Sequence, residues 1–369
     1  MDTTTNCSCV DSAMENITQT WISDVMLPLV GFTGIIGNFC AAIVLVCPEM
    51  KSTFHQSLLT LALCDILFIS SALIEHFTDT SSPTYVLLFP YVWNPLKNIL
   101  MSWETYLIMS IATERFAAIC KPLCYRAHKL SHSSKVHLLT FVFPSVIASI
   151  LLNIPKFFET HLVSRNETNG INGTVVIIDY EATDLRLHPD YIFYYTHFTR
   201  FLLTGLLPVV FLSIINIAIC IKIKKSQKFS SFSSSSKFSS SPLHDSQRAL
   251  SNRSSSGYKQ RCKKSKNSAV TLSTVVIMYI ICNGPRLLLN LSEYIIGDEL
   301  YEVDSCNCSL APDWFFILIR ISHLFLAINS SANFLIYFSV CQKFKTVCMK
   351  RLRNLIHSTA TDETENDLF

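Results

Sequence analysis

Long apolar stretches separated by short polar segments dominate the pattern of this chain. A helix needs about 20 apolar residues to cross the core of a bilayer. Seven stretches approach or exceed this length: Val25–Cys47, Gln56–Phe77, Asn94–Ile119, Val136–Pro155, Phe198–Ile221, Ala269–Leu291 and Trp314–Phe338. The pattern predicts an all-α membrane protein with a single seven-transmembrane helix bundle. Because seven is an odd number, we expect the two termini on opposite sides of the membrane.

Three segments outside these stretches carry patterns of their own. In the second outer loop, Lys156–His197, the β-prone run Thr174–Ile178 follows the turn-rich run Asn169–Gly173, which predicts a β-hairpin. Cys341–Ile356 interleaves apolar and basic positions at helical spacing, and we expect a short amphipathic eighth helix on the lipids of the inner leaflet. The serine-rich stretch 226–257 has no apolar face, which predicts a disordered cytoplasmic loop.

The charged residues predict the orientation of the bundle. Half of the 369 residues are hydrophobic and 15% are charged, whereas a soluble domain carries about 25% charged residues. With the N-terminus outside, 22 of the 30 Lys and Arg residues lie on the cytoplasmic side, as the positive-inside rule requires. We expect a plasma-membrane protein with an extracellular tail (1–24), a seven-helix domain (25–340) and a cytoplasmic helix and tail (341–369). No signal peptide is visible in the tail, so the first span is expected to act as a signal anchor.

Sequons and cysteines predict modifications of the outer segments. Five Asn-x-Ser/Thr sequons lie there, at Asn6, Asn16, Asn166, Asn172 and Asn307. Four of the 14 cysteines face the oxidising exterior, namely Cys7, Cys9, Cys306 and Cys308. One or two disulfides between the tail and the last outer loop, pairing within the tail, and free thiols are all compatible with the sequence. In the eighth helix, Cys348 is either a palmitoylation site or a free buried thiol.

Polar residues within the predicted spans are costly, so they are candidates for function. Asp65 lies in the second span, and Glu104 in the third span lies at about the same depth. The expected partners of Asp65 are Asn38, Asn329 and Asn333. Two neighbouring acids in a low dielectric do not both ionise without a cation. We therefore expect the two acids to share a proton or to bind one Na⁺; the alternative is that Glu104 is a protonated, hydrogen-bonded structural residue.

Several motifs resemble a known family. Glu114-Arg115-Phe116 ends the third span, Asn333–Tyr337 lies in the seventh, and Leu61–Asp65 lies in the second. Together with Gly37-Asn38 they resemble the rhodopsin-like (class A) G-protein-coupled receptors over roughly Val25–Arg353. Other segments resemble the FMRFamide-receptor-like neuropeptide receptors of invertebrates: Asn153–Glu159, Thr183–Arg186, Arg200–Pro208, Cys282–Asn290 and Ile328–Phe334.

This resemblance implies a receptor for an extracellular peptide that signals through a heterotrimeric G protein and engages arrestin and receptor kinases. The coupling and activation face would comprise Glu114, Arg115, Asn216, Asn333 and Tyr337. The chain departs from the family pattern at four positions. Pro90 stands where most class A receptors have a disulfide-forming Cys, and Asn283 replaces the usual Trp of helix six. Phe334 replaces the helix-seven Pro, and Ser265 replaces an acid, so neither the kink nor an ionic lock to Arg115 is carried over.

Charged residues at the outer ends of the helices predict a ligand pocket. They are Glu75, Lys97, Arg200, Arg286, Glu293 and Arg320. Lys97 stands where amine receptors of similar fold have Asp, which argues against a monoamine. We expect Glu75 or Glu293 to meet a ligand arginine, and Arg286 and Arg200 to meet carbonyl oxygens or a C-terminal amide. In the alternative, these residues pair with one another around a water-filled vestibule.

Other classes of function fit the pattern less well. A class A receptor for a non-peptide small molecule or lipid is the first alternative, against which the hydrophilic second outer loop and the charged pocket argue. A transporter or channel is more remote, because no internal repeat is evident. An enzyme is not expected, since the chain shows neither a nucleophile–base arrangement nor a cluster of metal-ligand spacing. No nucleic-acid partner and no cofactor other than the Na⁺ are expected.

Overall fold

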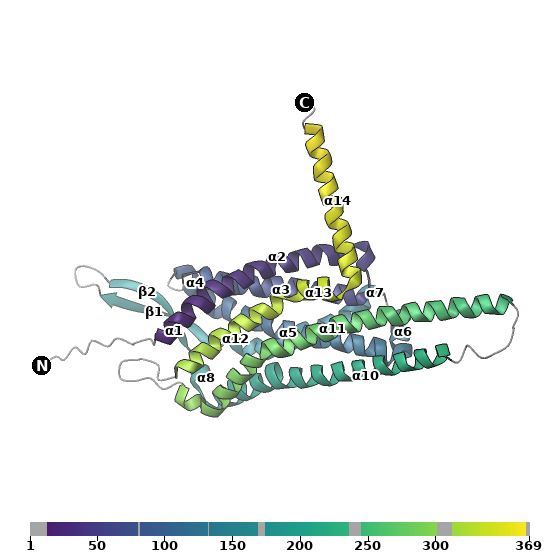
Figure 1. Cartoon of the computed structure of the whole chain (residues 1–369). Coiled ribbons are helices and arrows are strands. Elements are labelled where there is room, and N and C mark those ends of the chain that lie inside the picture. The colour runs from purple at the N-terminus through teal and green to yellow at the C-terminus, as the bar shows by residue number, and fades with distance from the viewer. Residues whose placement is uncertain are drawn as a thin grey trace.

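The computed structural model describes residues 13–79, 82–131, 133–168, 174–235, 245–300 and 312–366. Long helices run side by side in one bundle (Figure 1). Within the described residues, six helices are long and apolar enough to cross a membrane: Asn16–Val46, Thr53–Phe77, Leu138–Phe157, Pro189–Lys225, Asn267–Glu293 and Asp313–Ser331. The seventh long helix is α5 (Asn94–Cys120), which packs against its neighbours within the bundle. The predicted seven-helix bundle is therefore present.

Several of the seven helices are built from consecutive segments. The first consists of α1 (Ala13–Thr18), the π-helical η1 (Gln19–Met26) and α2 (Leu27–Val46). The second helix is α3 (Thr53–Phe77). The third consists of α4 (Pro83–Leu88), η3 (Phe89–Trp93) and α5, and the fourth of α7 (Ser134–Asn153) and η4 (Ile154–Phe157). The fifth helix consists of α9 (Pro189–Tyr191), η5 (Ile192–Thr199), η6 (Phe201–Leu206) and α10 (Leu207–Ser235). The sixth is α11 (Asp245–Leu300), and the seventh consists of α12 (Asp313–Ser331) and α13 (Asn333–Val340).

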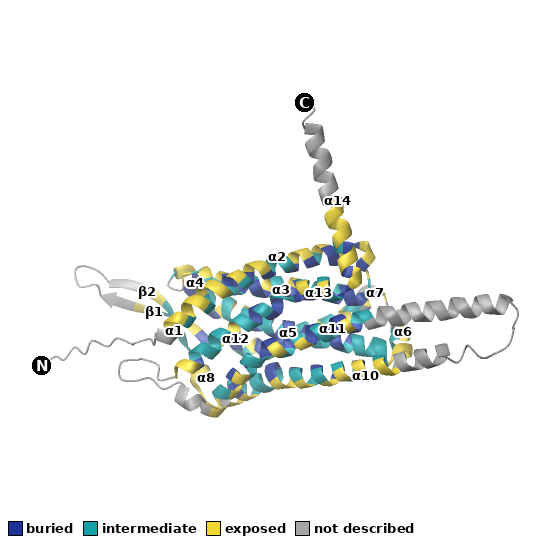
Figure 2. Ribbon diagram, viewed as in Figure 1, coloured by how far each residue is buried: buried dark blue, intermediate teal, exposed yellow. Residues whose placement is uncertain are grey.

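Apolar side chains cover both the inside and the outside of this bundle. On α2, exposed Phe32, Ile36, Phe39 and Ile43 recur every three or four residues along one face. Figure 2 shows exposed residues on the outward faces of the helices and buried residues along their inward faces. An outward surface of large apolar side chains is what a helix needs when its surroundings are lipid.

The centre of the core is formed around α5. Leu107, Ile108 and Ile111 of α5 pack in one cluster with Leu212 of α10 and Tyr279 of α11. At the first helix the packing depends on the absence of a side chain. A Cβ built at Gly34 would collide with Ser331 of α12, so this glycine allows the first and seventh helices to approach closely.

The second outer loop forms the predicted β-hairpin. Strands β1 (Thr160–Thr168) and β2 (Thr174–Ala182) pair antiparallel. Tyr180 of β2 stacks on Phe89 with ring centroids 4.5 Å apart, directly before Pro90, where the family resemblance places a missing cysteine. The hairpin is therefore held to the third helix by an aromatic contact at this point. A short helix, α8 (Asp184–Leu187), follows the hairpin.

The opposite end of the bundle carries the elements that the sequence predicts to be cytoplasmic. The loop between α2 and α3 contains η2 (Pro48–Met50), and α6 (Pro122–Ser131) follows α5. Helix α14 (Gln342–Asn366) is longer than the predicted amphipathic helix and projects sideways from that end of the bundle (Figure 1). Its Lys350 forms an ion pair with Glu49 at 3.5 Å. The predicted disordered stretch 226–257 is helical over most of its described length, since α10 continues to Ser235 and α11 begins at Asp245; residues 236–244 lie outside the described part.

The seventh helix is interrupted although it lacks the family's proline. α12 ends at Ser331 and α13 begins at Asn333, with Ala332 between them at ψ −15°. The Ser331 hydroxyl donates a hydrogen bond of 3.1 Å to the carbonyl of Val30 on α2. The break therefore occurs where the seventh helix contacts the first, with Phe334 in place of proline.

Candidate ligand cavity and signalling face

Arg115, near the C-terminal end of α5, contacts an acid and an aromatic ring. Its guanidinium pairs with the buried carboxylate of Glu114 and lies 4.5 Å from the centroid of the Phe54 ring. Glu114 also accepts a hydrogen bond of 2.7 Å from the Tyr125 hydroxyl of α6. Burial and the charge of Glu114 raise the pKa of Tyr125, so this hydroxyl keeps its proton. Among the described residues, no side chain of α11 pairs with Arg115.

A cavity of about 620 Å³ opens beside Arg115. Its lining includes Tyr125 and two residues of other elements, Asn267 of α11 and Lys343 of α14. Nearby, Ser273 of α11 donates a hydrogen bond of 2.6 Å to the Asn216 side chain of α10. This bond links the fifth and sixth helices on the side of the bundle where Arg115 lies.

Halfway through the bundle, two buried carboxylates have separate partners. Asp65 Oδ2 accepts a hydrogen bond of 2.6 Å from Asn333. Glu104 accepts hydrogen bonds from Asn329 at 2.5 Å and from the Ser330 hydroxyl at 3.0 Å. The expectation that Asn329 and Asn38 bond to Asp65 is wrong.

Asn329 instead links the seventh helix to Glu104 of the third, and Asn38 links the first helix to the seventh. Asn38 donates to the carbonyl oxygen of Ser330 at 2.8 Å and to that of Gly34 at 3.0 Å. Asp65 Oδ1 is buried and has no hydrogen-bond partner among the described residues, and the same holds for the Tyr337 hydroxyl. Buried polar atoms of this kind are rare in folded proteins and mark a place where a proton, water or ion fits.

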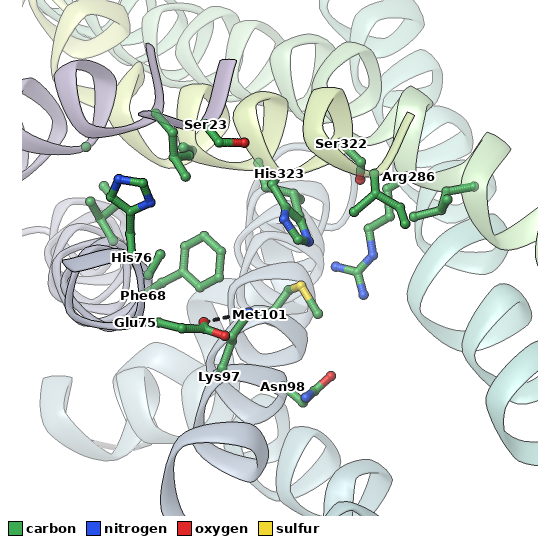
Figure 3. A pocket seen from close by; sticks show the side chains of 18 of the residues that line it. Ser23, Phe68, Glu75, His76, Lys97, Asn98, Met101, Arg286, Ser322 and His323 are labelled. Atoms are coloured by element: carbon green, nitrogen blue, oxygen red, sulfur yellow. Dashed lines mark hydrogen bonds and ion pairs between the residues drawn. The ribbon is translucent and has the colours of Figure 1, made fainter. Parts of the chain in front are cut away.

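The outer end of the bundle contains a cavity of about 560 Å³. Side chains from the first, second, third, fifth, sixth and seventh helices line it, among them Gln19, Glu75, Lys97, Arg200, Arg286, Glu293 and His323. Figure 3 shows Glu75 and Lys97 on one wall, with Arg286 and His323 projecting from the other. Five of the six charged residues predicted for a ligand pocket are therefore brought together.

The charged residues of this cavity differ in how they are paired. Lys97 Nζ forms an ion pair of 2.6 Å with Glu75, and Arg200 donates to the Asn98 side chain at 3.2 Å. Arg286 is only 8% exposed. In the described part of the chain, neither Arg286 nor Glu293 makes a hydrogen bond or an ion pair. The cavity thus offers one cation and one anion that are open to a ligand.

The sixth predicted pocket residue lies elsewhere. Arg320 is not among the residues that line the cavity; it donates to Gln19 at 2.8 Å and to Thr18 at 3.5 Å. Sequence reasoning missed His323, which lines the cavity. Its place as a titratable side chain within an apolar span, where polar groups are costly, is the signal that could have found it.

Two of the predicted modification sites lie on described residues. Asn16 is exposed on α1, and Cys348 is half-buried on α14. The remaining glycosylation and disulfide candidates fall outside the residues whose side chains are described: Asn6, Asn166, Asn172, Asn307, Cys7, Cys9, Cys306 and Cys308.

Comparison with known proteins confirms the resemblance seen in the sequence. The FMRFamide receptor of Drosophila melanogaster is 26% identical over 347 residues, which are 90% of this chain and 54% of that protein. The FMRFamide peptide receptor frpr-18 of Caenorhabditis elegans is 24% identical over 89% of this chain and 68% of its own length. The chain thus spans about half the length of its Drosophila relative. The model of the 7 transmembrane receptor (rhodopsin family) matches residues 37–337, and the chain belongs to this family of multi-pass membrane receptors, which are not enzymes.

Proposed function

We propose that this protein is a plasma-membrane receptor for a short, amidated peptide and that it activates a heterotrimeric G protein. The observation that carries the proposal is Arg286, a buried cation without a hydrogen-bond partner in the described chain, at a cavity on the outer side of the bundle. A buried charge is costly unless it is paired, so the site favours a ligand that supplies oxygen acceptors. Peptide carbonyls and a C-terminal amide supply them, and the names of both relatives point to the same ligand class.

One helix, α11, runs from the outer cavity to the cavity beside Arg115. Helix α11 carries Arg286 at the outer cavity, Tyr279 in the core and Ser273 near the cytoplasmic end. Tyr279 donates a hydrogen bond of 3.3 Å to Thr105 of α5. A ligand that binds Arg286 shifts α11, which is one continuous helix. A change in the position of α11 then alters the cavity beside Arg115. Activation is then a population shift between two arrangements of the bundle.

A reporter assay tests this function. The receptor is expressed with a promiscuous G protein, and a panel of amidated neuropeptides is screened for calcium release. We expect at least one peptide to act, and Arg286→Ala to reduce its potency by about 10- to 100-fold, because a hydrogen bond to a charged group contributes about 1.5 to 3 kcal/mol. Surface expression of the variant, measured with an N-terminal tag, should match wild type. Unchanged potency would exclude Arg286 as a ligand contact.

We further propose that Asp65 and Glu104 share a proton or hold one Na⁺. Supporting this are the partnerless Asp65 Oδ1 and the carboxylate and amide oxygens nearby, since hard cations prefer oxygen ligands. Asp65 and Glu104 would hold the ion, with Asn329 and Asn333 orienting the two carboxylates. A bound charge here would stabilise one arrangement of the second, third and seventh helices over the other.

The remaining expectations are part of the same proposal. The N-terminus is extracellular and carries glycans at the outer sequons, and the C-terminus is cytoplasmic. The basic face of α14 contacts anionic lipids, and Cys348 is its palmitoylation candidate. Arrestin and receptor kinases would act on the cytoplasmic face after activation.

A further inference from the structure

Two buried hydrogen-bond donors on one face of α11 lack acceptors at the outer cavity. Arg286 is 8% exposed and Asn290 is 9% exposed, and both line the cavity, into which Arg286 projects (Figure 3). Among the residues that the structure describes, Arg286 has no hydrogen-bond or ion-pair partner, and the buried Nδ2 atom of Asn290 has no hydrogen-bond partner. Because the two residues lie four positions apart on one helix, their side chains are neighbours on its surface.

A third donor approaches from the fifth helix. Arg200 lines the same cavity and acts electrostatically on Arg286, so the two guanidinium groups lie near each other. One Arg200 nitrogen donates to the Asn98 side chain at 3.2 Å, which leaves other N–H groups of this guanidinium for further acceptors. Asn290 faces the fifth helix as well, since a Cβ built at Gly205 would lie 3.7 Å from its Nδ2 atom. The three donors therefore meet at the interface between the fifth and sixth helices.

The charges that line the cavity do not balance. With its histidines neutral, the described lining contains three cations and two carboxylates: Lys97, Arg200, Arg286, Glu75 and Glu293. Lys97 and Glu75 neutralise each other in an ion pair of 2.6 Å. Glu293 acts on both arginines electrostatically but lies beyond ion-pair distance from them. One positive charge is left over, and buried like charges without a counter-ion are costly.

We propose that a small monovalent anion binds between Arg286, Arg200 and the amide of Asn290 when no activating ligand is present. Chloride is the abundant anion of this kind outside cells. The ion accepts charge-assisted hydrogen bonds from the two guanidinium groups and balances the surplus positive charge. Two of the three donors are more than nine-tenths buried, which favours a compact ion over a bulky one.

The ion makes the burial of Arg286 tolerable in the unliganded receptor. A buried cation without a partner destabilises the fold, and an anion that binds only the folded state stabilises it by mass action. A ligand oxygen that reaches Arg286 takes the place of the ion, and this step rests on the proposed function. The anion site itself depends on no activating ligand, so its test is separate from the search for a peptide.

The test measures the thermal unfolding midpoint of the purified, unliganded receptor in detergent. Chloride is exchanged for the bulky anion gluconate at constant Na⁺ concentration and ionic strength, so that the proposed Na⁺ site is not affected. Wild type should unfold about 2 to 4 °C higher in chloride than in gluconate, with a rise that saturates as chloride increases. Arg320→Gln removes an arginine that does not line the cavity, and it should keep the full chloride-dependent rise.

Two variants of the site make the outcome decisive. Arg286→Met should unfold at the same temperature in both salts, and no lower than wild type in gluconate, because an apolar side chain replaces the buried charge. Asn290→Leu keeps the charge but loses one donor, so half of the rise should require about 5-fold more chloride. A wild-type midpoint that is the same in both salts would overturn the inference, and so would a full chloride-dependent rise in Arg286→Met. If Arg286→Met cannot be purified, an unchanged chloride dependence in Asn290→Leu overturns it instead.

Discussion

At the scale of single residues, a charge inside the bundle is tolerated where its partners are fixed. Glu104 has two hydrogen-bond donors, Asn329 and Ser330, whereas Asp65 has a donor at only one of its oxygens. Arg115 is satisfied by Glu114 and the Phe54 ring. Asp65 is therefore the acid with an oxygen that can still accept a hydrogen bond or an ion, and ion or proton binding would act through it.

Glu104→Gln tests the pairing of the two acids. Removing one carboxyl lowers the negative charge that a Na⁺ or a shared proton would balance. In wild type, we expect ligand potency to change with Na⁺ concentration, or with pH if the pair shares a proton. Glu104→Gln should lose that dependence. The measurement is ligand-stimulated nucleotide exchange in membranes at varied Na⁺ and pH; identical profiles for the two proteins would rule out the ion or proton site.

Tyr125→Phe tests the contact that holds Glu114. Because burial and Glu114 raise the pKa of Tyr125, the hydroxyl donates its hydrogen bond throughout the cytosolic pH range. Without this donor, Glu114 and Arg115 are less firmly held, and we expect ligand-independent signalling to rise by about 2- to 10-fold. Tyr91→Phe, which removes the same atom at the outer end of the bundle, serves as the control. Basal signalling that stayed at the wild-type level would show that Tyr125 does not restrain the receptor.

At the scale of elements, the second outer loop is attached without a disulfide to the third helix. Lys156 and Glu159 are both buried and form an ion pair at 2.7 Å at the start of the loop. The hydroxyl of Tyr191, where the loop enters the fifth helix, donates to Glu159 at 2.8 Å, and Arg186 pairs with it at 3.4 Å. Both ends of the loop thus meet at one buried carboxylate.

Glu159→Ala should loosen this loop. The substitution leaves Lys156 buried without its partner, and breaking a buried ion pair costs about 3 to 5 kcal/mol. We expect a lower thermal unfolding midpoint in detergent and weaker surface expression. Because apolar residues can replace a buried ion pair without loss, the double variant Lys156→Met/Glu159→Leu should recover most of the stability. A single variant as stable as wild type would show that the carboxylate does not hold the loop.

The sequence predicted elements better than their contacts. Apolar length located all seven helices, and β-prone residues located strand β2, because both signals are local. The partners of Asp65 were misassigned because an intramembrane helix is apolar around its whole circumference, so periodicity leaves its rotation open. Arg320 was placed in the cavity by depth alone. Its actual partners, Thr18 and Gln19, lie about 300 residues away in the chain and depend on tertiary packing.

At the scale of the whole molecule, the two ends of the bundle are chemically distinct. The β-hairpin and α1 lie at one end, and α14 lies at the other (Figure 1). The end with α14 holds the basic residues Lys343, Lys345 and Lys350. From this asymmetry we predict a cytoplasmic face at α14 and an outward face at the cavity lined by Arg286.

The orientation gives a direct prediction. An epitope tag at the N-terminus should be accessible to antibody on intact cells, whereas a tag at the C-terminus should become accessible only after permeabilisation, as the distribution of basic residues requires. Flow cytometry with and without detergent makes the measurement. Asn16→Gln should also reduce the mass lost on treatment with a glycosidase. Accessibility of both tags on the same side would contradict the bundle and everything built on it.

The outward extension of the first helix has a practical consequence for engineering this receptor. Gln19 and Ser23 of η1 form part of the cavity wall, and Arg320 fastens that extension to the seventh helix through Gln19. A fusion protein joined directly at Leu27, where α2 begins, would remove these two lining residues and the hydrogen bond from Arg320. Biosensor or crystallisation chimeras should therefore be joined upstream of Ala13, so that the cavity keeps all of its lining residues.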